Sequence, residues 1–155
     1  MPLSVTKCNF VGELFMGTYE HRLDSKARLV LPAKIREKLG DVVVAALGLE
    51  NCISLYSEEE WGRFLEKIKS QPFYSNRDAR EFQRIMVGAA EEITVDGTGR
   101  ILLPGHLRKY AGLTQEVVIS GLADHVEIWD RERWVNIWEA GLENLSEIAK
   151  GMDGF

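Results

Sequence analysis

Two apolar runs in the first half of the chain have the pattern of buried β-strands. Val42–Leu47 is continuous and rich in valine, and Cys52–Tyr56 alternates between apolar and polar side chains. Short apolar runs bounded by turn residues are typical of strands. Upstream, Gly17–Leu23 is compatible with a strand, and Arg28–Leu31 is apolar after its arginine. Because the turn-forming Asp24 lies between these two segments, they predict a tight β-hairpin.

Other stretches repeat their apolar residues with the spacing of an amphipathic helix. The clearest one begins with a capping box of Ser57 and Glu60 and carries the stripe Trp61, Phe64, Leu65 and Ile68. A second helix is predicted over Asn76–Val87, with an arginine face made of Arg77, Arg80 and Arg84. We expect this face to be solvated; the alternative is that it faces DNA or a neighbouring subunit. A short helix within Pro32–Gly40 and a final helix capped by Asp130 complete the predicted elements.

The most informative pattern is a motif that the chain carries twice. Asp24 stands four residues before Arg28, Asp96 stands four residues before Arg100, and each arginine leads into an apolar run that ends in proline. The shift in numbering that takes Asp24 to Asp96 matches further identical positions, namely Glu20, Leu31, Pro32, Arg36 and Gly40 with Glu92, Leu103, Pro104, Arg108 and Gly112. After one inserted residue the shift grows by one and matches Val44, Gly48, Leu49 and Trp61 with Val117, Gly121, Leu122 and Trp134. These identities indicate an internal repeat.

The repeat predicts an α+β fold with a mainly β core, in the order ββαββ, two helices, ββαββ and a last helix. Each half has about 45 residues before its helices, which is too few to bury a good core alone. We therefore expect the halves to pair around a pseudo-twofold axis and to interlock their strands in one barrel. The expected divisions are an N-terminal extension (1–14), a first repeat (15–60), a helical connector (61–88), a second repeat (89–133) and a C-terminal helix and tail (134–155).

Composition narrows the class of protein. The 155 residues, 45% of them hydrophobic, suffice for a soluble globular core, and no apolar run approaches the roughly 20 residues of a membrane helix. The N-terminus lacks the features of a signal peptide, and the two cysteines, Cys8 and Cys52, fit a reducing compartment. The expected location is therefore the cytoplasm.

Charge is distributed unequally between the two copies of the motif. The net charge of −5 argues against a nucleic-acid partner for the chain as a whole, but the surface that carries the positive residues decides such binding. Residues 17–40 contain six basic and three acidic side chains, whereas the equivalent residues 89–112 contain three of each. The first copy thus has a net charge of +3 and the second has none.

The arginine that ends each turn is the strongest candidate for binding an anion. A guanidinium group can contact a phosphate or the edge of guanine through two hydrogen bonds. The alternative is a salt bridge from Arg28 or Arg100 to the aspartate of its own turn, and one arginine can serve both purposes. The residues expected to shape the turns are Asp24, Asp96, Gly97 and Gly99.

Enzymatic motifs are not found in the sequence. It contains no phosphate-binding loop of the P-loop type, no nucleophile elbow and no cluster of histidine and cysteine at metal-binding spacing. We therefore predict no enzymatic activity, no metal, no cofactor and no small-molecule substrate. The three histidines, His21, His106 and His125, are expected on strand surfaces, and the tryptophans in the core or at subunit interfaces.

Several segments resemble the MraZ family of transcriptional regulators. The matching segments are Phe15-Met16-Gly17, Tyr19-Glu20-His21, Leu23-Asp24-Ser25-Lys26-Ala27-Arg28, Pro32-Ala33-Lys34, Arg36-Glu37, Asp96-Gly97-Thr98-Gly99-Arg100, Leu107-Arg108, Ala111-Gly112-Leu113 and Glu127-Ile128-Trp129. The resemblance runs from about Leu14 to Trp138. It implies the double-split, swapped-hairpin barrel of the SpoVT–AbrB group, with both halves supplied by one chain.

The resemblance also implies a function. It indicates a nucleoid-associated bacterial repressor that binds double-stranded DNA, at short direct repeats in the promoter of the division and cell-wall gene cluster containing its own gene, as a ring-like homo-oligomer. The DNA contacts expected from the motif and its charge are Arg28, Lys26, Arg36, Lys34 and Arg100, with Arg22 weaker. Because of the charge difference, we expect the first turn to read DNA and the second mainly to complete the barrel.

Two departures and two alternatives accompany this hypothesis. Ala27 stands where the family commonly has glycine, which makes a positive φ angle harder to adopt, and residues 1–13 precede the usual start of such chains. The same barrel could instead be an adaptor that binds a protein partner through its turns. A small-molecule enzyme would need a deep pocket beside Asp24 or Asp96.

Overall fold

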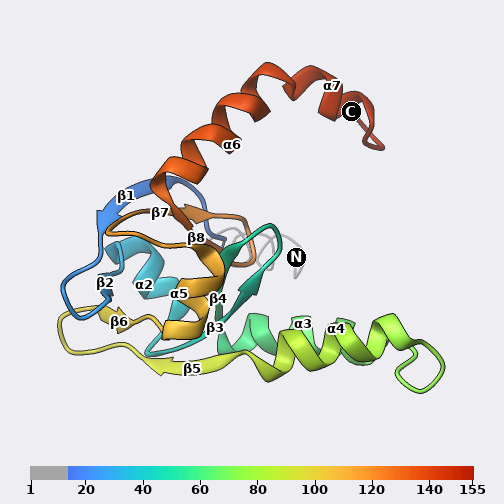
Figure 1. Ribbon diagram of the computed structural model, residues 1–155, viewed down its shortest axis with the longest axis horizontal. Helices are drawn as coiled ribbons and strands as arrows, with labels where there is room; N and C mark the ends of the chain where they lie inside the picture. The colour runs from blue at the N-terminus through green and yellow to red at the C-terminus, as the bar shows by residue number, and fades with distance from the viewer. Residues whose placement is uncertain (1–13) are drawn as a thin grey trace, which may run out of the picture.

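The computed structural model describes residues 14–155 and has an α+β architecture around a mainly antiparallel β core (Figure 1). The first half contains β1 (Thr18–Arg22), β2 (Arg28–Val30), α2 (Ala33–Leu39), β3 (Val42–Gly48) and β4 (Cys52–Ser57), followed by α3 (Glu58–Lys69) and α4 (Arg77–Gly88). The second contains β5 (Glu91–Thr94), β6 (Arg100–Leu102), α5 (Gly105–Ala111), β7 (Glu116–Gly121) and β8 (Val126–Asp130), followed by α6 (Arg131–Glu143) and α7 (Leu145–Lys150). The predicted ββαββ order is confirmed in both halves. The extension predicted for residues 1–14 lies outside the described residues, except for Leu14.

Both sheets contain strands of both halves. The large sheet has the order β1-β7-β8-β4-β3-β5, and the small sheet pairs β2 with β6. Thus β1 of the first half lies beside β7 of the second, and β5 of the second half lies beside β3 of the first. The two halves therefore share hydrogen bonds along most of their strands and form one body.

The tight hairpin predicted for β1 and β2 is wrong. The turn itself closes, because the Asp24 N–H donates to the Arg28 carbonyl at 3.0 Å, but the strands on either side of it then diverge. β1 pairs with β7 and β2 pairs with β6. A local hairpin would leave the outer edges of β3 and β7 without partners, and the crossed pairing satisfies those edges.

In two strand pairs, equivalent residues of the two repeats lie opposite each other. In the pairing of β4 with β8, Ser54 lies opposite Glu127, its own counterpart in the second copy of the repeat. In the pairing of β2 with β6, Leu29 lies opposite Ile101, which is likewise its counterpart. The two halves are thus related by a pseudo-twofold axis through these pairs.

The core contains matched residues from both halves. Leu29 and Ile101 are fully buried between the sheets. Around them pack equivalent side chains, namely Leu31 with Leu103, Ile35 with Leu107, and Ile53 and Leu55 with Val126 and Ile128. Val43 and Val117 also lie opposite equivalent residues, Ser57 and Asp130, so the match of Val44 with Val117 indicated by the sequence is off by one residue. Full burial of such a side chain stabilises the fold by roughly 1.5–3 kcal/mol. Since both repeats contribute side chains to this one cluster, neither half has a complete core alone.

Side-chain caps begin α3 and α4, but not α6. The Ser57 hydroxyl accepts from the Glu60 N–H at 3.2 Å, which confirms the predicted start of α3, and Asn76 caps α4 in the same way. Asp130 precedes α6, but its side chain makes no capping bond, so the predicted cap is wrong. Its carboxylate instead accepts from Thr114, from the N–H at 3.1 Å and from the hydroxyl at 2.7 Å. This bond ties the segment before β7 to the end of β8.

Two helical arms leave the sheet at separate places (Figure 1). The hairpin of α3 and α4 packs on β3 and β4, and α6 packs on β7 and β8 before it continues into α7. Across residues 14–155, every helix is too short or too polar to cross a membrane.

Candidate nucleic-acid interface

Each turn is organised by one aspartate, which accepts three hydrogen bonds in the first turn and four in the second. Asp24 Oδ1 accepts from the backbone N–H groups of Lys26 and Arg28, at 2.8 and 2.9 Å. Its Oδ2 accepts from Arg28 Nε at 2.7 Å. The carboxylate therefore shapes the turn and orients the guanidinium at the same time. The two roles considered for the arginine are thus compatible, because the hydrogen bond to Asp24 uses only the Nε of Arg28.

The second turn repeats this geometry. Asp96 Oδ1 accepts from the N–H groups of Thr98 and Arg100, both at 2.9 Å, and Oδ2 accepts from Arg100 Nε at 2.9 Å. The Thr98 hydroxyl adds a further bond to Oδ1 at 2.8 Å, which Lys26 cannot provide at the equivalent position of the first turn. In each turn the backbone hydrogen bond from the arginine is the main cause that lowers the carboxyl pKa. Both aspartates therefore stay ionised at neutral pH.

The pairing of β2 with β6 brings the two turns onto one surface. Leu31 N–H donates to the Gly99 carbonyl at 3.0 Å, and Leu103 N–H donates to the Ala27 carbonyl at 3.1 Å. Arg100 Nη1 lies 3.9 Å from Asp24 Oδ2, so one aspartate contacts arginines of both repeats. Turns that lie far apart in the sequence are thus immediate neighbours, which linear spacing alone did not reveal.

The outer face of this two-stranded ribbon mixes charge with apolar groups. Leu29 and Ile101 point inward, so the outward positions are Arg28 opposite Leu102 and Val30 opposite Arg100. Val30 and Leu102 are exposed, and the two arginine side chains are about one-third exposed, at 32% and 31%. A two-stranded ribbon fits the DNA major groove, where arginine binds guanine and apolar groups contact the thymine methyl. The face therefore has the composition of a DNA-reading ribbon.

Arg36 lies against the turn of the other repeat. A Cβ atom added to Gly99 would overlap the Arg36 guanidinium and come within 3.2 Å of its Cδ and Cζ atoms. Arg36 belongs to α2, in the segment that gave the first copy its positive charge. The inference that the second turn lacks positive neighbours is therefore wrong, because a count along the sequence assigned Arg36 to the first turn only.

The equivalent arginine of the second repeat is placed differently. Arg108 Nε donates to the Leu103 carbonyl at 3.1 Å instead of covering the opposite turn. The opposite turn has Ala27 where the other has Gly99, and both residues adopt a positive φ, 61° and 82°. The Cβ atom of Ala27 occupies the space that Gly99 leaves to Arg36. Ala27 thus adopts the positive φ that was expected to be difficult for a residue with a side chain, and its backbone is strained.

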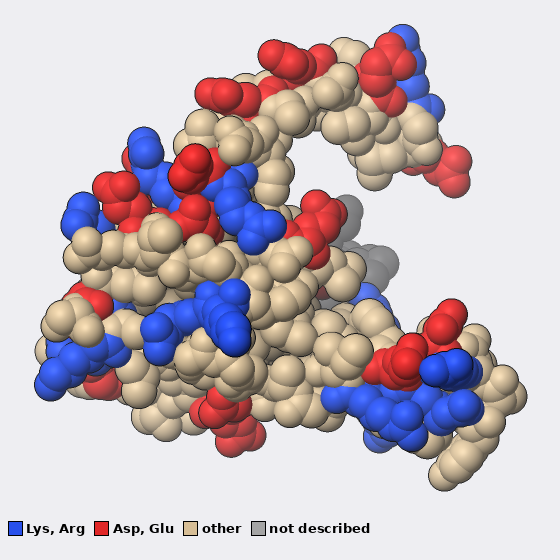
Figure 2. All heavy atoms as spheres, viewed as in Figure 1, with Lys and Arg blue, Asp and Glu red and all other residues tan. Residues whose placement is uncertain are grey.

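The other residues predicted to contact DNA or to shape the turns differ in exposure and in their contacts. Lys26 and Lys34 are exposed, the first in the turn and the second on α2. Arg22 is engaged at the end of β1, where it donates to Gln115 at 2.7 Å and lies 3.4 Å from Glu116. Gly97 is not among the described residues with positive φ, so the turn does not require glycine there. Blue side chains gather at the left edge of the molecule in Figure 2, where Figure 1 places these turns.

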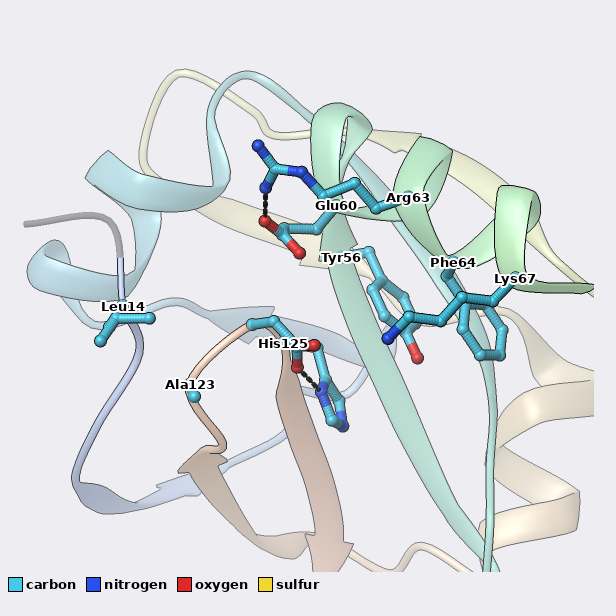
Figure 3. Close-up of a pocket in the computed structure, with 9 residues that line it drawn as sticks. Leu14, Tyr56, Glu60, Arg63, Phe64, Lys67, Ala123 and His125 are labelled. Atoms are coloured by element: carbon cyan, nitrogen blue, oxygen red, sulfur yellow. Dashed lines mark hydrogen bonds and ion pairs between the residues drawn. The ribbon is translucent and has the colours of Figure 1, made fainter. Parts of the chain in front are cut away.

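The aspartates of the turns do not line any of the main hollows in residues 14–155. One hollow, of about 400 Å³, lies instead between α3 and the loop before β8 (Figure 3). In this part of the chain, no group of three or more histidine, cysteine, aspartate or glutamate side chains is placed to hold a metal ion.

The prediction of a surface position is wrong for His125. Its ring stacks on Tyr56 with centroids 5.2 Å apart, and its Nδ1 lies 2.7 Å from Asp124 Oδ1 (Figure 3). Burial opposes the charged ring, but the hydrogen bonds with Glu127 and Asp124 raise the pKa of His125. Burial also raises the pKa of Tyr56 to about 12. Sequence spacing gave no sign of this cluster, because Tyr56 and His125 come from different halves.

Known proteins resemble the chain over nearly all of its described length. The family model of MraZ protein, described as antitoxin-like, matches residues 14–85 and again residues 86–155. A Transcriptional regulator MraZ from Heliobacterium modesticaldum is 46% identical over 142 residues, which cover 92% of this chain and 99% of that protein. Proteins of the same name from Lachnoclostridium phytofermentans and Caldanaerobacter subterraneus subsp. tengcongensis are 41% and 42% identical to this chain over 142 residues. These matches cover 97% and 99% of the two relatives. With both halves matched and relatives aligned over 92% of its length, the chain belongs to the MraZ family.

Proposed function

We propose that this chain is a sequence-specific DNA-binding transcriptional regulator. It acts as a repressor at short direct repeats in the promoter of the division and cell-wall gene cluster that contains its own gene. The observation that carries the proposal is the β2–β6 ribbon, on which two aspartate-oriented arginines and two exposed apolar residues form one face. The name of its relatives, Transcriptional regulator MraZ, supports the same class of function.

In this proposal both turns read DNA together. The fold is the interlocked double-split barrel in which each repeat supplies half of the ribbon, and the pseudo-twofold axis presents Arg28 and Arg100 symmetrically. Each aspartate fixes the Nε edge of its arginine in advance, so that less conformational freedom is lost when the terminal nitrogens bind a base. Lys26, Lys34 and Arg36 contact phosphates on either side. This replaces the expectation that the second turn only completes the barrel.

The acidic net charge is compatible with this proposal if several ribbons act at once. A single ribbon with few phosphate contacts binds weakly and with a strong dependence on salt. A ring-like homo-oligomer places several ribbons along regularly spaced DNA repeats, and later contacts then become intramolecular. Such binding implies a cytoplasmic protein that is associated with the nucleoid.

The proposal is tested by binding to the DNA upstream of the protein's own gene. Fluorescence anisotropy should show tighter binding to this DNA than to a shuffled duplex of the same length at moderate salt. Arg28→Ala should weaken specific binding at least tenfold, which corresponds to about 1.4 kcal/mol. Arg63→Ala is the matched control, since Arg63 lies on α3 and pairs with Glu59 at 2.6 Å, outside the β2–β6 ribbon.

Equal binding to both duplexes would contradict the sequence-specific function. Recovery of a protein partner through the same turns, without any enrichment of promoter DNA, would favour the adaptor alternative. Unchanged binding of Arg28→Ala, with a correctly assembled protein, would overturn the role given to the ribbon.

A further inference from the structure

Each strand of the β2–β6 ribbon exposes one apolar side chain. β2 and β6 have the same burial pattern, in which the middle residue is buried and the last residue is exposed. These last residues are Val30 and Leu102, with exposed fractions of 46% and 57%. Each follows the arginine of its turn by two residues, so it lies on the same face of the strand as that arginine. Both repeats therefore present an apolar residue beside an arginine.

The pairing of the strands places each apolar residue next to both arginines. Val30 lies opposite Arg100, and Leu102 lies opposite Arg28. Directly opposed side chains of antiparallel strands are about 5 Å apart, and side chains two residues apart on one strand are about 7 Å apart. The four side chains thus form one compact group, with the arginines on one diagonal and the apolar residues on the other.

The surroundings of these two apolar side chains set them apart from other exposed ones. Single exposed apolar residues are common on protein surfaces and need no partner. Val30 and Leu102, however, lie within the group that the proposed function brings against DNA, so they lose water together with the arginines. Contact with a polar base edge would remove hydrogen bonds of that edge with water and replace none of them. Their burial is favourable only against an apolar part of the DNA.

The major groove offers such a part in the 5-methyl group of thymine. The O6 and N7 atoms of guanine, which arginine binds, lie in the same groove. Apolar residues are also buried in DNA by insertion between stacked bases. A side chain that enters the stack must project beyond its neighbours, and valine and leucine are shorter than the arginines beside them. The composition of the group therefore favours the methyl contact.

We propose that Val30 and Leu102 contact thymine methyl groups and so help to determine which DNA sequence is bound. Arg28 and Arg100 select guanine through hydrogen bonds, and the two apolar residues select thymine at neighbouring base pairs. Cytosine and uracil lack the 5-methyl group and leave these side chains against polar edges. The inference rests on the proposed function and adds two residues to its reading of the bases.

Deoxyuridine in place of thymine tests this contact, because the replacement removes only the 5-methyl groups. The DNA is the duplex upstream of the protein's own gene. In fluorescence anisotropy, the natural protein should bind the deoxyuridine duplex at least about fourfold more weakly, as expected for one buried methyl-sized group. Binding to a shuffled duplex should be the same with thymine and with deoxyuridine, since phosphate contacts dominate non-specific binding.

A double variant, Val30→Ala with Leu102→Ala, assigns the methyl effect to these two side chains. It should bind the thymine duplex more weakly than the natural protein does, and the replacement by deoxyuridine should then cost it little further affinity. Loss of structure alone would not abolish the difference between the two duplexes. Leu49→Ala is the matched control, at an apolar side chain that is 67% exposed in the turn between β3 and β4, and it should keep the full methyl effect. Circular dichroism establishes that both variants are folded.

The inference is overturned if the natural protein binds the thymine and deoxyuridine duplexes equally, a comparison that depends on no variant. It is also overturned if the double variant keeps the full methyl effect. These failures differ from a failure of the proposed function. Equal binding of the natural protein to the upstream and shuffled duplexes would contradict the function itself, whereas a preference for the upstream duplex without any methyl effect would contradict the thymine contact alone.

Discussion

At the scale of single residues, the two turns share the same aspartate–arginine hydrogen bonds but differ in backbone strain. The same positive φ is adopted by Gly99 in one turn and by Ala27 in the other. For a residue with a Cβ atom this left-handed conformation costs roughly 1–2 kcal/mol. Arg36 packs where Gly99 has no Cβ atom, whereas Arg108 bonds the Leu103 carbonyl and does not pack on Ala27. The residue at this turn position therefore affects the charge of the surface as well as the stability of the protein.

Ala27→Gly is expected to stabilise the protein. The substitution removes the strain at φ 61°, but glycine also gains freedom in the unfolded chain, so the net increase in unfolding free energy should be about 0.5 kcal/mol. Gly99→Ala should have the opposite effect, because its Cβ would overlap the Arg36 guanidinium as well as strain the backbone. Urea unfolding of the three proteins measures both changes. A less stable Ala27→Gly protein would contradict the strain at this turn.

His125 is expected to make the stability depend on pH near neutrality. Its pKa is raised in the folded protein, so its contribution is fully present below the ordinary value of about 6.5 and is lost as the pH rises through the folded value. The groups around it are Asp124, Glu127 and Tyr56, with Lys67 across the hollow.

The natural protein should therefore have a higher urea midpoint at pH 6 than at pH 8. In His125→Gln this difference should shrink, since the neutral amide cannot gain a proton. If the substitution leaves the pH dependence unchanged, the cluster does not hold the protonated ring.

At the scale of elements, the sequence predicted the strands and helices but not how the strands pair. Val42–Leu47 and Cys52–Tyr56 correspond to β3 and β4, and the capping residues Ser57 and Asn76 begin α3 and α4 as expected. The local hairpin was wrong because pairing is decided by which edges remain open in the complete sheet, and nearby residues do not encode that. Likewise the aspartate–arginine pairs were predictable from their spacing. The proximity of the two turns, the reach of Arg36 to Gly99 and the His125 cluster depend on the pairing.

The crossed pairing predicts that neither half folds alone. Residues 14–85 lack the partners of β1, β2 and the open edge of β3, and residues 86–155 lack those of β5, β6 and β7. Each fragment expressed separately should give the narrow amide spectrum of an unfolded chain in two-dimensional NMR. Mixing the fragments should restore the dispersed spectrum of the natural protein. A dispersed spectrum from either fragment alone would contradict a core that needs both repeats.

At the scale of the whole molecule, one body presents three distinct surfaces. The β2–β6 ribbon carries the candidate DNA contacts, the α3–α4 hairpin carries an apolar hollow, and the α6–α7 arm carries a row of exposed apolar side chains. The ribbon uses other elements than the two arms. In the proposed function, several such ribbons in one assembly bring the modest basic faces of an acidic protein to DNA together.

The central claim, that both turns form one DNA-reading surface, is tested most directly by comparing Arg28→Ala with Arg100→Ala on the same promoter duplex. The account predicts that each substitution weakens specific binding at least tenfold, about 1.4 kcal/mol, while the assembled mass stays natural. Because the two arginines have equivalent ion pairs and exposure, the losses should be similar. Natural affinity of Arg100→Ala beside a large loss for Arg28→Ala would contradict the shared surface, and natural affinity of both would contradict the DNA-reading ribbon itself.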